Sequence, residues 1–167
     1  VVDIQHRAQC VALDEQQGAI ILLDIKAAFP SLGHSFIMNM LQLLGLPSGT
    51  LNFIGNLYKG HRCNINIGNL AHDGFDIRSG IRQGCPISPL ILALVLDIAL
   101  RRMQRLLPEE TVRAFADDIG IVVPNLKRAL PILEGIFKDL LDITGLELNL
   151  PKCVIIPLWP IAPNTLQ

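Results

Sequence analysis

The sequence lacks the closely spaced cysteines of a zinc site or a disulfide framework. Cys10, Cys63, Cys85 and Cys153 are far apart, and no C-x-x-C pair occurs. Structural zinc sites and small disulfide-stabilised folds depend on such pairs or on a dense set of cysteines. The spacing therefore argues against both, and a reducing compartment is the default.

A strong net charge is also absent. The 14 Lys and Arg residues nearly balance the 15 Asp and Glu residues, so the formal net charge is −1. Proteins that bind nucleic acid on their own normally present a basic face to the phosphates. The overall charge therefore counts against autonomous binding to DNA or RNA.

No segment is long and apolar enough to predict a membrane span. The longest apolar stretch, residues 89–100, contains Asp97 and ends at Arg101 and Arg102, whereas a bilayer needs about 20 apolar residues. Residues 1–7 lack the layout of a secretion signal. We expect no membrane association, and the absence of an initiating methionine predicts that the sequence is a fragment of a longer chain.

What the sequence does contain is enough apolar material for a core. Apolar residues make up 50% and charged residues 17% of the 167 residues. This composition is typical of a globular chain and not of a disordered one. The length matches one domain, so residues 1–167 are predicted to form a single domain.

The pattern along the chain predicts helices and strands in a defined order. The expected elements are a strand at 19–24, helices at 35–44 and 50–58, a hairpin at 63–67 and 75–78, a helix from 88, a hairpin at 112–123, a helix from 126 or 130 to 144, and strands at 146–150 and 154–158. Helices segregated from a mainly antiparallel sheet, and packed on one face of it, make an α+β domain.

Some details of these elements are specific enough to test. The continuous apolar run of residues 19–24 predicts a central strand that is buried on both faces. Ser88 should cap the following long helix, with Pro89 at its first position. Pro131 should start or kink the last helix, and Gly145 should end it.

The long helix from residue 88 has an expected buried face and an expected solvated end. The buried face is predicted to consist of Leu90, Ile91, Leu94, Val95, Ile98 and Met103. The solvated end is predicted to hold Arg101, Arg102 and Arg105, where cations suit the helix dipole.

Two adjacent acids, Asp117 and Asp118, are the most informative feature. Apolar, β-prone runs flank them, which predicts a tight hairpin with both carboxylates at its tip. Adjacent like charges repel one another unless a cation neutralises them. Asp24 ends the apolar strand, so it could share a pair of divalent cations, roughly 3.5–4 Å apart, with the hairpin acids. Taken singly, each acid could equally be a turn or cap residue.

Four motifs in order resemble those of reverse transcriptases of the non-LTR (LINE-type) retrotransposon kind. D-I-K-A-A-F at residues 24–29 resembles the first aspartate motif, and G-I-R-Q-G-C-P-I-S-P-L at residues 80–90 resembles R-Q-G-C-P-x-S-P-L. F-A-D-D at residues 115–118 resembles Y/F-A-D-D, and G-L-E-L-N-L-P-K-C at residues 145–153 is similar to G-L-x-x-N-x-x-K-T/C. The resemblance implies a polymerase palm with part of the fingers, the upstream fingers and the thumb being absent.

The resemblance also implies the catalytic and metal-binding residues. Asp24, Asp117 and Asp118 would bind two Mg²⁺ ions, for which Mn²⁺ could substitute, and Asp118 would have a supporting role. The carbonyl of Ile25 and the substrate phosphates would be further ligands. Lys152 would lie near the leaving pyrophosphate as a general acid, although an exposed loop lysine describes it equally well.

A second group of residues is implied to bind the incoming nucleotide. Ala27 and Ala28 would offer backbone N–H groups to the triphosphate. Phe29 would act as a steric gate that clashes with a 2′-OH, although a lone Phe is usually a core residue. Gln83 would contact the nucleotide, and Gly84 would let the backbone come close.

The implied function is RNA-dependent DNA polymerase activity, in which a DNA primer is extended on an RNA template with dNTPs. The alternative is a catalytically inactive retroelement remnant or a domesticated interaction module. The R-Q-G-C-P-x-S-P-L and A-D-D motifs argue against RNA-dependent RNA polymerases and nucleotide cyclases. The missing fingers and thumb, or flanking domains of a parent polyprotein, would carry the basic groups that the net charge of −1 does not supply. The setting would be intracellular, in the nucleus or cytoplasm if the element is eukaryotic.

Overall fold

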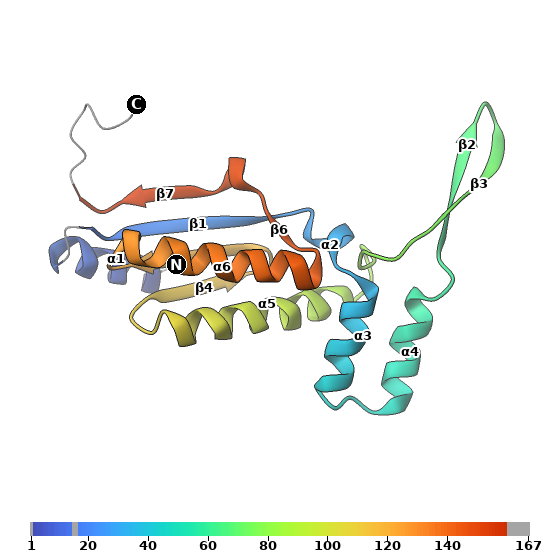
Figure 1. Cartoon of the computed structure of the whole chain (residues 1–167), viewed down its shortest axis with the longest axis horizontal. Coiled ribbons are helices and arrows are strands. Elements are labelled where there is room, and N and C mark those ends of the chain that lie inside the picture. The colour runs from blue at the N-terminus through green and yellow to red at the C-terminus, as the bar shows by residue number, and fades with distance from the viewer. Residues whose placement is uncertain (1, 15–16, 160–167) are drawn as a thin grey trace.

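A five-stranded antiparallel sheet forms the centre of the molecule, and an arm of two helices and a two-stranded ribbon extends from one end (Figure 1). The structure is a computed structural model that describes residues 2–14 and 17–159. Its helices and antiparallel strands make an α+β fold, which confirms the predicted fold class.

The elements follow the predicted order, with additions. The helices are α1 (Val2–Asp14), α2 (Ala28–Ser31), α3 (His34–Leu43), α4 (Ser48–Tyr58), α5 (Ser88–Leu106) and α6 (Leu126–Thr144), and a short 3-10 helix, η1, covers Leu150–Lys152. The strands are β1 (Ala19–Lys26), β2 (Arg62–Ile67), β3 (Leu70–Asp76), β4 (Thr111–Phe115), β5 (Asp118–Val123), β6 (Glu147–Leu148) and β7 (Val154–Pro157). Helices α1, α2 and η1 were not predicted from the sequence.

Strand β1 is the central strand of the sheet, as expected. On one side it pairs with β5, from Ala19 opposite Val123 to Asp24 opposite Asp118. On the other side it pairs first with β7 and then with β6. Because β5 pairs with both β4 and β1, the β4–β5 hairpin that carries Asp117 and Asp118 (the acid hairpin) lies directly beside β1.

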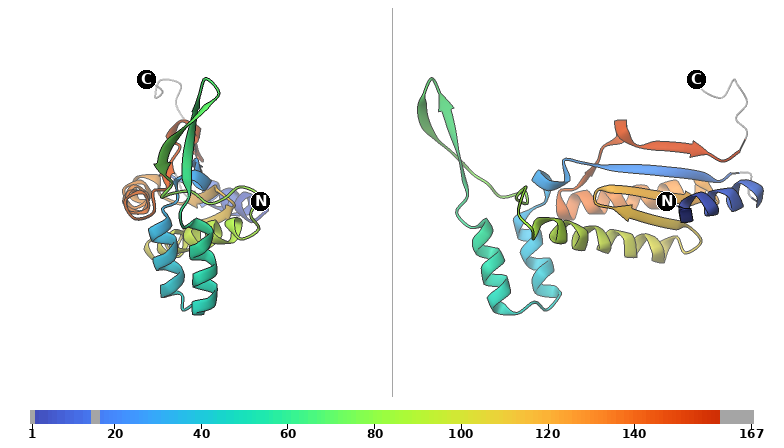
Figure 2. Two further views of the ribbon diagram at one scale, coloured as in Figure 1. Left: turned by 90° about the vertical axis from the view of Figure 1, so that its right-hand side faces the viewer. Right: turned by 180° about the vertical axis from the view of Figure 1, so that it is seen from behind.

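The prediction that β1 is buried on both faces was wrong. Ile21 and Ile25 are buried in the core that α5 and α6 share with the sheet, whereas Leu22, on the opposite face, is 42% exposed. Helix α1 covers only one end of that second face, where Ala8 and Val11 pack against Val122. Helices α5 and α6 therefore pack on one face, as predicted, and the second face is open near Asp24. Figure 2 shows α1 at the end of the sheet far from the arm.

The predicted buried face of α5 was only partly right. Ile91, Val95 and Met103 are buried, but Leu90, Leu94 and Ile98 are exposed, and Leu92, Leu96 and Ala99 are buried in their place. Nearly every position from 90 to 100 is apolar, so periodicity could not select the face, and packing against the sheet and α6 decided it.

Within the residues that the structure describes, no helix is long and apolar enough to cross a membrane.

The ends of the two long helices differ in part from the prediction. Ser88 is the first residue of α5 and is fully buried, so it does not act as the side-chain cap. Helix α6 begins after Asn125, whose side chain accepts a hydrogen bond from the backbone N–H of Arg128, and Pro131 lies inside the helix instead of starting it. Gly145 ends α6 with a φ of 83°, as predicted.

The arginines at the end of α5 form ion pairs on the surface. Arg101 pairs with Asp97 at 2.6 Å, and Arg102 pairs with Asp139 of α6 at 2.5 Å. Such exposed pairs contribute at most about 1 kcal/mol each. The prediction of a solvated face at this end of α5 is confirmed.

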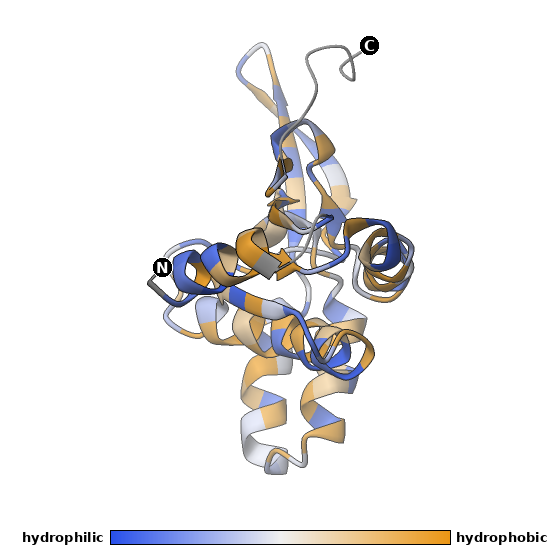
Figure 3. Cartoon of the chain, turned by 90° about the vertical axis from the view of Figure 1, so that its left-hand side faces the viewer, coloured by the Kyte–Doolittle hydropathy of each residue, from blue (hydrophilic) through white to orange (hydrophobic). Residues whose placement is uncertain are grey.

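The arm consists of α3, α4 and the β2–β3 ribbon. Gly68 and Asn69, with φ values of 55° and 66°, form the turn between Ile67 and Leu70, as expected for a type I′ hairpin. The returning strand begins at Leu70, earlier than predicted. Apolar and polar segments alternate along the helices of the arm, α3 and α4, as in amphipathic helices (Figure 3). The ribbon projects away from the sheet, with most of its residues exposed.

Candidate active site

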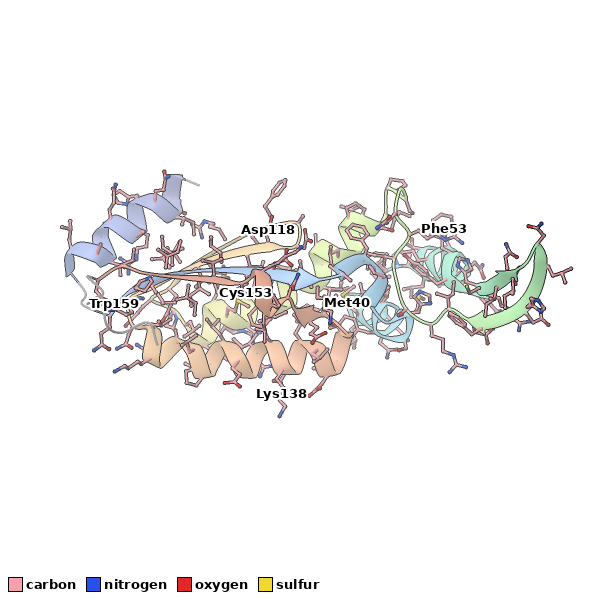
Figure 4. All side chains as sticks on the ribbon, turned by 90° about the horizontal axis from the view of Figure 1, so that it is seen from above. Met40, Phe53, Asp118, Lys138, Cys153 and Trp159 are labelled. Atoms are coloured by element: carbon pink, nitrogen blue, oxygen red, sulfur yellow. The ribbon has the colours of Figure 1, made fainter. Side chains whose placement is uncertain are left out.

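The pairing of β1 with β5 places Asp24 directly opposite Asp118. Opposite residues of an antiparallel pair point to the same face, with Cβ atoms roughly 5 Å apart. This is the face that α5 and α6 leave uncovered. Figure 4 shows Asp118 at the end of the hairpin nearest the arm. Like charges placed opposite each other destabilise a sheet, so this position favours a bound cation.

Asp117 lies in the loop of the hairpin. Because Phe115 pairs with Asp118, Ala116 and Asp117 form the connection between β4 and β5. Ala116 has a φ of 54°, a left-handed conformation that costs an alanine about 1 kcal/mol. The predicted tight hairpin with carboxylates at its tip is therefore present. The sharing of a cation between Asp24 and Asp117 stays a prediction.

Asp24 is held by residues that follow α6. The side-chain amide of Asn149 donates to Oδ2 of Asp24 at 2.8 Å, and the backbone N–H of Asn149 donates to the Asp24 carbonyl at 2.9 Å. Nζ of Lys152 lies 3.9 Å from the same Oδ2. The side chain of Asp24 is 23% exposed and that of Lys152 is 69% exposed. The fourth motif thus folds back onto the first aspartate motif.

Sequence reasoning missed Asn149 as a partner of Asp24. The available signal was the asparagine of the fourth motif, but its contact depends on β6. This short strand pairs Ile25 with Leu148 and Lys26 with Glu147, so the next residue, Asn149, lies beside Asp24. A two-residue strand has too little pattern to fix that register from the sequence.

Three of the predicted nucleotide-binding residues line one cavity. It has a volume of about 520 Å³ and is lined by Phe29, Gln83, Gly84, Cys85, Pro86 and Pro89. Phe29 also lines a neighbouring cavity together with Ala114 and Ala116 of the acid hairpin. Its ring is partly buried against the core. Phe29 therefore lies between the Gln83–Gly84 segment and the hairpin, while it also packs on the core.

The alanines of the first aspartate motif differ in their surroundings. Ala27 is exposed and left-handed, with a φ of 46°, and it precedes α2. Ala28 is buried, with 4% of its surface exposed. The structure therefore brings Ala28 into the core, and the contact of either backbone N–H with a triphosphate stays a prediction.

Arg82 contacts a histidine. Its guanidinium is hydrogen-bonded to the ring of His61, at the base of the ribbon. Among the described residues Arg82 forms no ion pair. The R-Q-G-C-P segment is thereby tied to the arm.

The carboxylates do not form a closed metal cage. In residues 2–14 and 17–159, no group of three or more His, Cys, Asp or Glu side chains is arranged to hold a metal ion. Mg²⁺ does not require one, because it is usually bound by one or two carboxylates plus water and substrate phosphates. The acids of β1 and the hairpin fit that kind of open site, and a role for the Ile25 carbonyl stays a prediction.

The thiol of Cys85 has an environment that favours the thiolate. The backbone N–H of Ile87 lowers the pKa of Cys85 most strongly, and burial opposes this by raising it. The side chain and backbone of Ser88 and the charge of Arg82 lower the pKa further. Because the thiolate is the reactive form of cysteine, the lowered pKa of Cys85 should make this thiol more reactive than an ordinary cysteine.

We expect iodoacetamide at pH 7 to alkylate Cys85 severalfold faster than Cys10, Cys63 or Cys153, although all four are partly buried. Mass spectrometry of the peptides after short exposures measures the four rates. A Cys85→Ser variant is the control and should lose only the fast phase. Equal rates at all four positions would contradict the lowered pKa.

The motifs, the fold and the open acidic site point to one class of protein. A family model described as reverse transcriptase (RNA-dependent DNA polymerase) matches residues 2–160. The chain therefore belongs to the reverse transcriptase family, and the resemblance inferred from the four motifs is confirmed.

Its curated relatives include polyproteins of retrotransposons. The chain is 33% identical over 141 residues to the retrovirus-related Pol polyprotein of the type-2 retrotransposable element R2DM from Drosophila melanogaster, covering 78% of this chain and 13% of that protein. It is 32% identical over 146 residues to the corresponding polyprotein of a type-1 element R2 from Popillia japonica, covering 82% of this chain and 20% of that protein. The chain thus spans a small part of these relatives.

Among solved structures, telomerases have a similar fold. The telomerase of Candida tropicalis in complex with the TWJ fragment of telomeric RNA superposes with a TM-score of 0.71 at 14% identity, over 93% of this chain and 29% of that one. The apo form of that telomerase gives a TM-score of 0.68, also at 14% identity, over 94% of this chain and 32% of that one. At this identity the likeness concerns the fold alone.

Proposed function

We propose that this chain is the palm of an RNA-dependent DNA polymerase, which joins a deoxynucleotide to a primer 3′-OH with the help of two divalent cations. The observation that carries the proposal is the strand register. It sets Asp24 opposite Asp118, next to the loop that holds Asp117. Membership of the reverse transcriptase family supports the reaction type.

The acidic residues would bind Mg²⁺, with Mn²⁺ as a substitute. Asp24, Asp117 and Asp118 supply hard carboxylate oxygens, to which the Ile25 carbonyl adds one more donor. When bound, the cations would stabilise charge on the attacking and leaving oxygens of the transferred phosphoryl group. The carboxylates would hold the cations in place and orient the primer end. This positioning would supply much of the rate.

The cavity beside Phe29 would receive the incoming dNTP. Gln83 and Gly84 line it together with Phe29, and Phe29 also reaches the cavity next to Ala116 in the acid hairpin. A nucleotide there would have its sugar against the Phe29 ring, where a 2′-OH would clash. The backbone N–H groups of Ala27 and Ala28 would contact the triphosphate.

Lys152 would act on the leaving group. Its ammonium lies 3.9 Å from Oδ2 of Asp24 and is largely exposed, so it is close to the proposed metal site and free to turn toward pyrophosphate. There it would donate a proton as the pyrophosphate leaves.

The RNA template and DNA primer would need contacts beyond this chain. A net charge of −1 offers little attraction to phosphates. The R2 polyproteins among its relatives are much longer, with 13–27% of their length matched. The missing fingers, the thumb or other flanking domains would supply the basic residues that bind the phosphates.

The direct test is primer extension by the full-length protein that carries this sequence. With a DNA primer on an RNA template, dNTPs and Mg²⁺, we expect extension, and an Asp24→Asn variant should lose it. Asp73→Asn is the matched control, because Asp73 lies on the exposed ribbon far from the site. If the wild-type protein is inert in both Mg²⁺ and Mn²⁺, the chain is a retroelement remnant or an interaction module instead.

A further inference from the structure

Asp24 has a different neighbour on each side of β1. On one side the register places Asp118 opposite it. On the other side the β1–β6 ladder ends with Ile25 opposite Leu148, and Asn149 follows with two hydrogen bonds to Asp24, one from its backbone at 2.9 Å and one from its side chain at 2.8 Å. The acid therefore faces repulsion on one side and a neutral donor on the other.

The two oxygens of the Asp24 carboxylate are not equivalent. Oδ2 accepts from Nδ2 of Asn149 and lies 3.9 Å from Nζ of Lys152. In the part of the chain that the structure describes, Oδ1 accepts no side-chain hydrogen bond. One oxygen is therefore engaged by the fourth motif, and the other is available to a ligand.

We propose that Asn149 is a positioning residue that holds Oδ2 of Asp24 and so keeps Oδ1 available to a divalent cation. Without this donor the carboxylate could turn, and the ammonium of Lys152 could take both oxygens and compete with the cation. The inference rests on the function proposed above and adds to it a residue that acts only through Asp24. Outer partners of this kind commonly change metal affinity by 10- to 100-fold.

The chemistry of asparagine suits this task. Its amide donates a hydrogen bond but carries no charge, so it orients Asp24 without neutralising it. A lysine or arginine in its place would neutralise the carboxylate and repel a cation, and an aspartate would add a third negative charge beside Asp24 and Asp118.

The side chain of Asn149 can be tested separately from its backbone. The carbonyl of Asn149 accepts from the backbone N–H groups of Lys152, at 2.8 Å, and Cys153, at 3.1 Å, and its own N–H donates to the carbonyl of Asp24. These bonds shape the η1 turn and persist when the side chain is changed. Replacing Asn149 therefore removes the amide donor while the turn is kept.

The experiment is a titration of the full-length protein with Mn²⁺ alone, followed by the EPR signal of free Mn²⁺ and without turnover. We expect Asn149→Ala to weaken Mn²⁺ binding about tenfold and Asn149→Gln, which keeps an amide donor, to retain part of the affinity. The Asp24→Asn variant shows how much Mn²⁺ the protein still binds when the site is lost. Glu147→Gln is the matched control, since it breaks the 3.3 Å pair between Glu147 in β6 and Lys26 in β1 without touching Asp24.

A second variant tests the competition with Lys152. Adding Lys152→Met to Asn149→Ala should recover Mn²⁺ binding, because the competing ammonium is removed.

In primer extension, Asn149→Ala should raise the Mg²⁺ concentration for half-maximal rate by a similar factor and leave the KM for dNTP unchanged.

The outcomes separate this inference from the proposed function. If Asn149→Ala binds Mn²⁺ like the wild type while Asp24→Asn does not, Asn149 is only a turn residue. If Glu147→Gln weakens binding as much as Asn149→Ala, the packing of β6 is responsible and the positioning role is overturned. A wild type that binds Mn²⁺ no better than Asp24→Asn would contradict the proposed metal site itself, and the role of Asn149 with it.

Discussion

Replacing Asp117 by Asn is expected to slow polymerisation by at least about a hundredfold. Asp117 lies in the loop of the β4–β5 hairpin, beside the Asp24–Asp118 pair. The substitution removes a charged ligand at nearly constant side-chain volume. Loss of roughly 3 kcal/mol of transition-state stabilisation corresponds to about this factor. Single-nucleotide primer extension by the full-length protein at saturating dNTP measures the rate.

The thermal stability of the same variant provides the control. The melting temperature should stay the same or rise slightly, because the repulsion between Asp117 and Asp118 is relieved. A folded Asp117→Asn variant with the wild-type rate would show that this acid takes no part in catalysis. A variant that loses both rate and melting transition would point to a structural role in the hairpin.

Replacing Phe29 by Ala is expected to raise the ratio of ribonucleotide to deoxyribonucleotide incorporation by about tenfold to a hundredfold. Phe29 lines both the cavity of Gln83 and Gly84 and the cavity beside the acid hairpin. Removing the ring leaves room for a 2′-OH, and discrimination by shape in such a pocket is worth roughly this factor. The measurement is the kcat/KM for dNTP and rNTP opposite the same template base.

Phe36→Ala is the matched control for the Phe29 variant. Phe36 is also partly buried against the core, but it lines a separate cavity between α5 and α6. It should lose stability without a change in sugar selectivity. If Phe29→Ala lowers the incorporation of both nucleotides equally and melts early, Phe29 is a core residue and not a steric gate.

The local elements around the site could be predicted because each one carries its own signal. An apolar run ending at Asp24 is a strand, Asp117 and Asp118 between two β-prone runs lie on a hairpin, and Gly145 ends α6. Turn chemistry and short-range periodicity act within a few residues, so a single sequence is enough to recognise the elements that they form. The order of the four motifs also led to the reverse transcriptase family, which the family model confirms.

The wrong predictions concern which face of a helix or strand is buried. In α5 nearly every position from 90 to 100 is apolar, and the prediction buried Leu90, Leu94 and Ile98, which are exposed. In β1 the continuous apolar run predicted two buried faces, but Leu22 is 42% exposed. A uniformly apolar segment has no periodicity that marks one side, so only the packing of neighbouring elements selects the buried face.

By itself, the sequence determined which chemical groups are present, which elements carry them, and to which family the chain belongs. Only the tertiary structure decided which of these groups meet. The register of β1 with β5 places Asp24 opposite Asp118, and the two-residue strand β6 brings Asn149 and Lys152, more than a hundred residues further along the chain, to the same carboxylate. Contacts of this kind depend on strand pairing over long separations, and a slip of one residue would turn every side chain of the strand to the other face.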